Sequence, residues 1–151
     1  METTNNKNLA AVLQLSLLTQ YFIPFGNYIF PVIIWNMYKK DSELVNHHGK
    51  QALNFQLSLL IYTILLTLIA LPILAFTILK NIDLYTIING NDIEIDQMNL
   101  GNISGIVLVA VLAIMIFFFL KLAEFILIIY AAIKASNNEM YKYPLTINFI
   151  K

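Results

Sequence analysis

Two charged residues, Lys121 and Glu124, stand inside an otherwise apolar stretch in the last third of the sequence. Residues three positions apart share one face of a helix, so these two side chains can form an ion pair. Ionisable groups inside a membrane helix are costly and often have a function. Three roles are open: an internal pair that fixes helix packing, which we favour, a path for protons or ions, and an anchor for a partner subunit.

A second group of polar residues comes just before a long apolar stretch in the middle of the chain. Gln51, Asn54 and Ser58 follow a helical stripe, and His47 lies one turn earlier. Amide and hydroxyl side chains of this kind hydrogen-bond to neighbouring helices where lipid offers no other partner. We interpret the stripe as a packing surface for another helix, and a polar channel wall or substrate site is the alternative.

The residue types that carry catalysis or bind metals form no recognisable constellation. The sequence has no cysteine, which excludes thiolate metal sites and cysteine nucleophiles. The two histidines, His47 and His48, are adjacent, so on a helix their side chains point about 100° apart and cannot easily share one metal ion. The acidic residues between positions 81 and 102 lack the order of a calcium-binding loop. We therefore expect no enzymatic activity, no cofactor and no metal site.

The composition is that of a membrane protein. Hydrophobic residues make up 59% of the 151 residues and charged residues only 12%, which is about half the charged fraction of a soluble domain. The formal net charge is zero, so the chain has no electrostatic footprint for nucleic acid. We expect one membrane domain over residues 1–151, with the lipid bilayer and another integral membrane protein, or a second copy, as its partners.

Two stretches are long enough to cross a bilayer as helices, which takes about 20 mostly apolar residues. The first covers residues 47–80, where Pro72 should introduce a kink. The second covers residues 103–134. Between them, residues 81–102 form an acidic outer loop, in which Asn-Gly between alternating residues predicts a β-hairpin.

The N-terminal third of the chain allows two interpretations, because prolines and a glycine divide its apolar run. It could be a single kinked span, which would place the N-terminus outside. It could instead be a hairpin of two short helices over residues 8–23 and 27–38. We favour the hairpin, because Pro and Gly at this spacing are typical of a turn. The predicted fold class is then all-α integral membrane, with four helical segments.

The lysines predict the orientation, since short cytoplasmic loops are rich in basic residues. Residues 39–50 form a loop with three lysines, and residues 135–151, together with Lys134 before them, form a tail region with three more, whereas residues 81–102 have none. The loop and the tail should therefore face the cytoplasm. All nine basic residues are lysines, a bias typical of an AT-rich bacterial genome. We expect a multi-pass protein of the bacterial inner membrane, with a cytoplasmic C-terminus.

Several motifs together resemble a known family. They are Pro31-x-x-x-Trp35, Tyr38-Lys39-Lys40-Asp41, the run from His47 to Gln56, and Tyr143-Pro144-Leu145. They resemble small bacterial membrane proteins that are grouped, by remote similarity, with the Tic-type import component of the chloroplast inner envelope. The resemblance implies a four-helix membrane fold and a link to protein translocation or envelope maintenance. It transfers no catalytic residues.

The function expected from the sequence is therefore that of a non-enzymatic accessory or scaffold subunit that binds another membrane protein. The alternative is a small pore or carrier for protons, ions or polar solutes. Both hypotheses place the activity on the same polar side chains, which could bind a partner or line a polar path: His48, Lys50, Gln51, Asn54, Gln56, Lys121 and Glu124.

Overall fold

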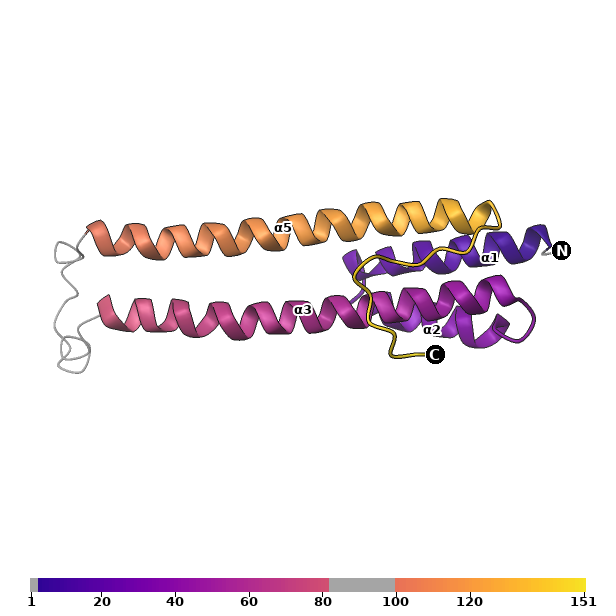
Figure 1. Ribbon diagram of the computed structural model, residues 1–151, viewed down its shortest axis with the longest axis horizontal. Helices are drawn as coiled ribbons and strands as arrows, with labels where there is room; N and C mark the ends of the chain where they lie inside the picture. Colours follow the sequence, from indigo (N-terminus) through magenta and orange to yellow (C-terminus); the bar gives the residue numbers. More distant parts are fainter. Residues whose placement is uncertain (1–2, 82–99) are drawn as a thin grey trace. The chain divides into compact units, whose positions relative to one another are not determined.

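The computed structural model describes the backbone of residues 3–81 and 100–151, and the side chains of these residues except 77–81, 100–104 and 106. In chain order the elements are α1 (Thr4–Leu15), the 3₁₀ helix η1 (Ser16–Tyr21), α2 (Gly26–Tyr38), α3 (Glu43–Asn81) and α5 (Leu100–Ser136) (Figure 1). A C-terminal tail without regular secondary structure, residues 137–151, follows α5. The described residues contain helices and no strand, which confirms the all-α prediction. The predicted β-hairpin falls on residues outside those described.

The described chain divides into two units. Residues 1–62 and 121–151 form one, which we call the packed unit, and residues 63–120 form the other, which we call the apolar unit. α3 and α5 each contribute residues to both units.

The N-terminal third of the chain is a helical hairpin, as the favoured interpretation predicted, and α1 and η1 pack against α2. The first arm differs from the single helix expected over residues 8–23. It begins at Thr4, because the Thr3 hydroxyl accepts a hydrogen bond from the amide of Asn6 at 3.3 Å. It changes to a 3₁₀ helix at Ser16, where the hydroxyls of Ser16 and Thr19 bind carbonyls three residues back, each at 2.6 Å.

The first long helix begins earlier than expected. α3 starts at Glu43 instead of residue 47, because the Ser42 hydroxyl accepts a hydrogen bond from the amide of Val45 at 3.2 Å. The loop expected over residues 39–50 is therefore only residues 39–42, and Lys50 lies within the helix. The helix assignment continues through Pro72. α5 is also longer than the predicted 103–134, since it runs from Leu100 to Ser136.

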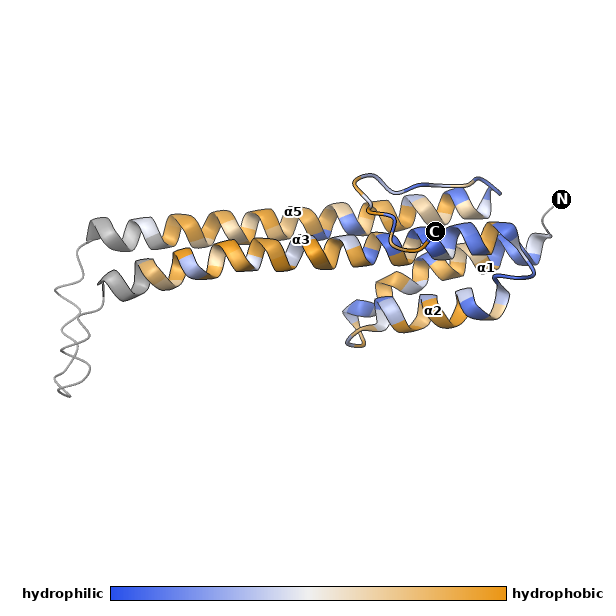
Figure 2. Cartoon of the chain, turned by 60° about the horizontal axis from the view of Figure 1, so that its bottom comes forward, coloured by the Kyte–Doolittle hydropathy of each residue, from blue (hydrophilic) through white to orange (hydrophobic). Residues whose placement is uncertain are grey.

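Both long helices have the length and composition of membrane spans. The candidate spans are Glu43–Phe76 and Val107–Ser136, each with a mean hydropathy of 2.6 over its most apolar window. The described side chains of the apolar unit carry no charge and are largely exposed: Leu68 is 64% exposed and Ile114 is 66% exposed. In Figure 2, most of this part of α3 and α5 has the colour of hydrophobic residues. Such a surface suits lipid and would be a liability in water.

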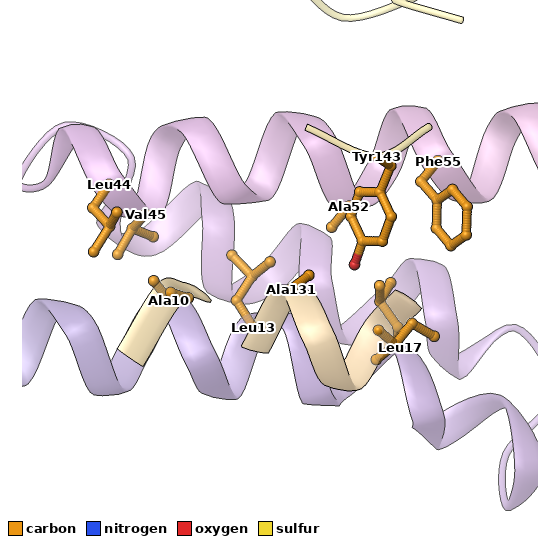
Figure 3. Close-up of a cluster of buried hydrophobic side chains, with 11 residues drawn as sticks. Ala10, Leu13, Leu17, Leu44, Val45, Ala52, Phe55, Ala131 and Tyr143 are labelled. Atoms are coloured by element: carbon orange, nitrogen blue, oxygen red, sulfur yellow. The ribbon is translucent and has the colours of Figure 1, made fainter. Parts of the chain in front are cut away.

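The packed unit has its own hydrophobic core, drawn in Figure 3. Small residues such as Ala10, Ala52 and Ala131 let the helices approach closely. The ring of Tyr143, from the tail, stacks on Phe55 of α3 with the centroids 4.1 Å apart and the planes 8° from parallel. The core therefore joins α1, η1, α3, α5 and the tail. Its members are Ala10, Leu13, Leu17, Leu44, Val45, Ala52, Phe55, Ile128, Ala131, Ala135 and Tyr143.

Candidate functional site

The polar residues singled out from the sequence gather in the packed unit around the carboxylate of Glu124. Its Oε1 accepts hydrogen bonds from Gln20 Nε2 at 2.8 Å and from Gln56 Nε2 at 2.9 Å. Its Oε2 accepts from Lys121 Nζ at 2.8 Å. Lys121 also donates to Gln20 Oε1 at 3.3 Å. One carboxylate thus links η1, α3 and α5.

The ion pair expected between Lys121 and Glu124 is present, and its two members differ in exposure. The Glu124 side chain is 1% exposed and the Lys121 side chain 38% exposed. A carboxylate this deeply buried needs several donors, because burying an unpaired charge costs far more than burying a neutral polar group. Two amides and one ammonium supply them.

Gln56 connects this carboxylate to the hairpin. Its Oε1 accepts from Asn27 Nδ2 at 2.7 Å, while its Nε2 donates to Glu124. Its backbone carbonyl accepts from the hydroxyl of Tyr28 at 3.2 Å. Gln56 therefore holds α2 to α3 and α3 to α5.

His48 is fully buried and belongs to a second chain of hydrogen bonds. Its Nε2 lies 3.0 Å from the carbonyl of Glu139, which can only accept, so Nε2 carries the proton. Its Nδ1 then accepts from Gln14 Nε2 at 3.0 Å. Gln14 Oε1 in turn accepts from the hydroxyl of Tyr143 at 2.6 Å. Burial raises the pKa of Tyr143 well above its ordinary value, so the hydroxyl remains a donor. Both nitrogens of the His48 ring are engaged by protein groups.

The stripe that contains Asn54 and Ser58 binds the C-terminal tail, where the sequence suggested another helix. Asn54 Oδ1 accepts from the amides of Phe149 at 3.1 Å and Ile150 at 2.8 Å, and Asn54 Nδ2 donates to the carbonyl of Ile150 at 3.0 Å. Ser58 Oγ accepts from the amide of Ile147 at 2.9 Å. One turn further along α3, the hydroxyl of Tyr62 donates to the carbonyl of Leu145 at 2.6 Å. The prediction of a helix as the partner of this stripe was wrong.

The remaining sequence candidates are placed differently. His47 Nε2 lies 3.0 Å from the carbonyl of Tyr141, a further contact with the tail. The side-chain oxygen of Gln51 is buried and has no hydrogen-bond partner among the described residues. Lys50 stays outside the two chains of hydrogen bonds in the part of the chain that the structure describes.

Four residues central to the network were not among the sequence candidates: Gln14, Gln20, Asn27 and Tyr143. Each makes its contact with a residue far away in the sequence; Gln20, for example, is 104 positions from Glu124. For the three amides, Gln14, Gln20 and Asn27, the available signal was an uncharged polar side chain inside an apolar run. In lipid such a group must find a partner within the protein.

A comparison with models of protein families identifies the family of the chain. Residues 5–150 match the model of the MamF/MmsF family, described as the magnetosome magnetite crystal formation protein family. The chain belongs to this family. The match takes in every described helix except the first residue of α1. No curated protein and no solved structure matches the chain.

Membership of the MamF/MmsF family overturns the resemblance to Tic-type import components, which was wrong. The run from His47 to Gln56, which carried that resemblance, serves internal packing: His48, Asn54 and Gln56 all bond to other parts of the same chain. Residues that serve internal packing are no evidence for a role in protein translocation. A magnetosome membrane family with two candidate spans indicates a membrane protein. The inner-membrane location and the cytoplasmic C-terminus stay predictions.

Proposed function

We propose that this chain is a non-enzymatic membrane protein that takes part in mineral crystal formation at a membrane, as the description of its family implies. The observation that carries the proposal is the family match over residues 5–150. It covers the packed unit and both candidate spans, so it does not depend on a local motif.

The buried polar network supports a structural role for the packed unit over a conducting one. Both oxygens of Glu124 accept hydrogen bonds from donors on η1, α3 and α5. A proton path would need this carboxylate to exchange partners during each transfer, whereas three donors from different elements hold it in place. We therefore assign the network to holding the helices together and place the action on the crystal elsewhere in the chain.

The sequence between the two long helices supplies chemistry suited to a mineral surface. Residues 81–102 contain Asp83, Asp92, Glu94 and Asp96 and no basic residue. Carboxylate oxygens are the ligands that hard cations prefer. An acidic segment between two membrane spans can act on cations at a growing crystal without any catalytic group.

Magnetite precipitation in the presence of the protein reconstituted in liposomes tests this proposal. The mean crystal size, measured by electron microscopy, should differ from that obtained with empty liposomes. Changing the four acidic residues of this segment to Asn or Gln should restore the size seen with empty liposomes. The double variant Asp41→Asn, Glu43→Gln is the matched control and should behave as the unaltered protein does. Equal sizes with unaltered protein and with empty liposomes would contradict the proposal.

An ion-flux measurement on the same liposomes tests the pore or carrier that the sequence left open. We expect no flux of protons or small ions above that of empty liposomes. A flux that disappears with Glu124→Gln would support the pore and refute the structural assignment of the network.

A further inference from the structure

The turn of the N-terminal hairpin, residues 21–25, exposes an unusual amount of aromatic and aliphatic surface. Phe22 is 87% exposed, Phe25 72%, Tyr21 53% and Ile23 45%. The neighbouring polar side chains face inward instead, since Gln20 bonds to Glu124 and Asn27 to Gln56. The tip of the hairpin is therefore apolar on its outer side and polar on its inner side.

The charged residues of this region lie at the opposite end of the hairpin. No Asp, Glu, Lys or Arg occurs from residue 8 to residue 38, and the flanking charges are Lys7 and Lys39. At that end, Trp35 Nε1 donates to Asn46 Oδ1 at 3.0 Å. At the tip end, Asn27 contacts Gln56. Between these contacts α3 advances by ten residues, or about 15 Å. The hairpin thus has a charged base and an uncharged tip.

The tip lies where the polar part of each long helix gives way to apolar sequence. On α3 it contacts Gln56, and residues 57–79 are uncharged. On α5 its neighbour Gln20 contacts Lys121 and Glu124, and residues 103–120 are uncharged. Two helices thus place the tip at the start of the stretches that have the composition of a bilayer interior.

Several backbone groups of the turn have the partners within the protein that entering lipid requires. The amides of Phe22 and Ile23 donate to the carbonyl of Thr19 at 3.0 and 2.8 Å. The amide of Gly26 donates to the carbonyl of Ile23 at 3.0 Å. Position 24 is a proline and has no amide to satisfy. The turn therefore does not depend on water for these hydrogen bonds.

Phe25 has a φ of 60°, in the left-handed region that favours glycine. The adjacent Gly26 is needed for a different reason: a Cβ there would lie 2.6 Å from the hydroxyl oxygen of Thr19. The turn thus holds a strained backbone at a residue whose ring is largely exposed. Most of this side chain has no packing partner among the described residues, since it is 72% exposed, but its ring can be buried in lipid.

We propose that residues 21–25 insert into the hydrocarbon of one leaflet, so that the hairpin is a re-entrant membrane element. α2 has 13 residues, about 20 Å, which is less than the roughly 30 Å of a hydrocarbon core. The chain enters from its charged base, turns within the leaflet and returns to the same side. The inference rests on the membrane character of the chain and is independent of its action on crystals.

The absence of cysteine from the sequence allows this to be tested with single labels. Phe25→Cys and Met37→Cys lie near opposite ends of α2 and replace side chains of similar exposure, 72% and 63%. Lys40→Cys is the reference in water, and Phe22→Cys gives a second tip position. In nanodiscs, where both faces are accessible, we expect fluorophores at 22 and 25 to be quenched severalfold more by lipids brominated in mid-chain than the one at 37. A membrane-impermeant thiol reagent should react at 40 at least tenfold faster than at 22 or 25.

Two results would overturn the proposal. Tip cysteines that react with the impermeant reagent as fast as Lys40→Cys would show that the turn is in water. Tip positions shielded from both the reagent and the brominated lipids would show that a protein surface covers them, such as that of a second copy.

Discussion

The packed unit and the apolar unit use the same two helices in opposite ways. In the packed unit, α3 and α5 carry Gln56 and Glu124, which hydrogen-bond to each other and to the hairpin. In the described part of the apolar unit, the hydroxyl of Thr67 donates to the carbonyl of Thr63 at 2.8 Å. This hydrogen bond lies within one helix, since the two residues are one turn apart on α3. Polar contacts between elements are thus concentrated in one unit. Most positions of the apolar unit need only be apolar. The loss of stability caused by a substitution should therefore depend strongly on the unit in which the residue lies.

The largest difference in stability between a substitution in the packed unit and one in the apolar unit is expected for Glu124→Ala. It removes an acceptor from Lys121, Gln20 and Gln56, and each buried donor that is left unsatisfied costs about 1–3 kcal/mol. Thermal unfolding in mild detergent should show a large loss of stability, whereas Leu68→Ala, at an exposed position of the apolar unit, should change little. Lys121→Met should also destabilise the chain, because it leaves the carboxylate of Glu124, whose side chain is 1% exposed, without its counter-charge. Equal losses for Glu124→Ala and Leu68→Ala would abolish the contrast between the units.

Two glycines give a matched comparison of the same change in each unit. A Cβ at Gly49 would lie 2.2 Å from Cδ1 of Trp35, so Gly49→Ala should overpack the core and cost up to about 3 kcal/mol. A Cβ at Gly105 would meet nothing within 4 Å, so Gly105→Ala should be neutral or stabilise by up to about 1 kcal/mol. The melting temperature of Gly49→Ala should fall, whereas that of Gly105→Ala should rise slightly or stay unchanged.

Asn54→Leu tests how the tail is held. It removes three hydrogen bonds to Phe149 and Ile150, and at about 0.6 kcal/mol each in a membrane protein the loss is about 2 kcal/mol. Carboxypeptidase should then digest the tail faster. Asn148→Leu, at an exposed position of the tail, is the control and should leave the rate unchanged. An unchanged rate for Asn54→Leu would mean that these hydrogen bonds do not retain the tail.

The smallest effect is expected from alkaline pH. The pKa of Tyr143 is raised above its ordinary value in the folded chain, mainly by burial, so the unfolded chain loses this proton first. Its contribution to stability is complete below the ordinary pKa of about 10 and is lost as the pH rises towards the folded value. Melting temperatures of the unaltered protein should fall above that pH. Tyr143→Phe should reduce the slope without removing it, because the pKa of Tyr141 is raised as well, again mainly by burial.

Part of this architecture was accessible from the sequence because it follows from local spacing. Hydropathy indicated both spans, Pro24 and Gly26 indicated the turn of the hairpin, and the three-residue spacing of Lys121 and Glu124 indicated their pair. In each case the signal lies within a few helical turns of the feature that it predicts.

The partners of the buried amides were not accessible, since they depend on which helices meet. Gln14 finds His48 34 positions away, and Asn27 finds Gln56 29 positions away. The tail was missed for another reason: Asn54 and Ser58 bind its main-chain groups, which are the same at every residue. The side chains of the tail therefore give no indication in the sequence that the tail contacts α3. The family could not be inferred either, because the motif used for it serves packing.

The contact between α3 and the tail joins two different repeats. Asn54, Ser58 and Tyr62 follow one another at four-residue steps, each an axial advance of about 6.0 Å. The tail contacts these residues at two-residue steps, Phe149, Ile147 and Leu145, in antiparallel order. It is not a regular extended strand, because Leu145 has a φ of 54° and the amide of Phe149 also donates to the carbonyl of Ile147 at 3.1 Å. Four positions of the helix therefore correspond to two positions of the tail. A single residue inserted between 145 and 149 would change this correspondence, so the hydrogen bonds on only one side of the insertion could keep their present partners on α3.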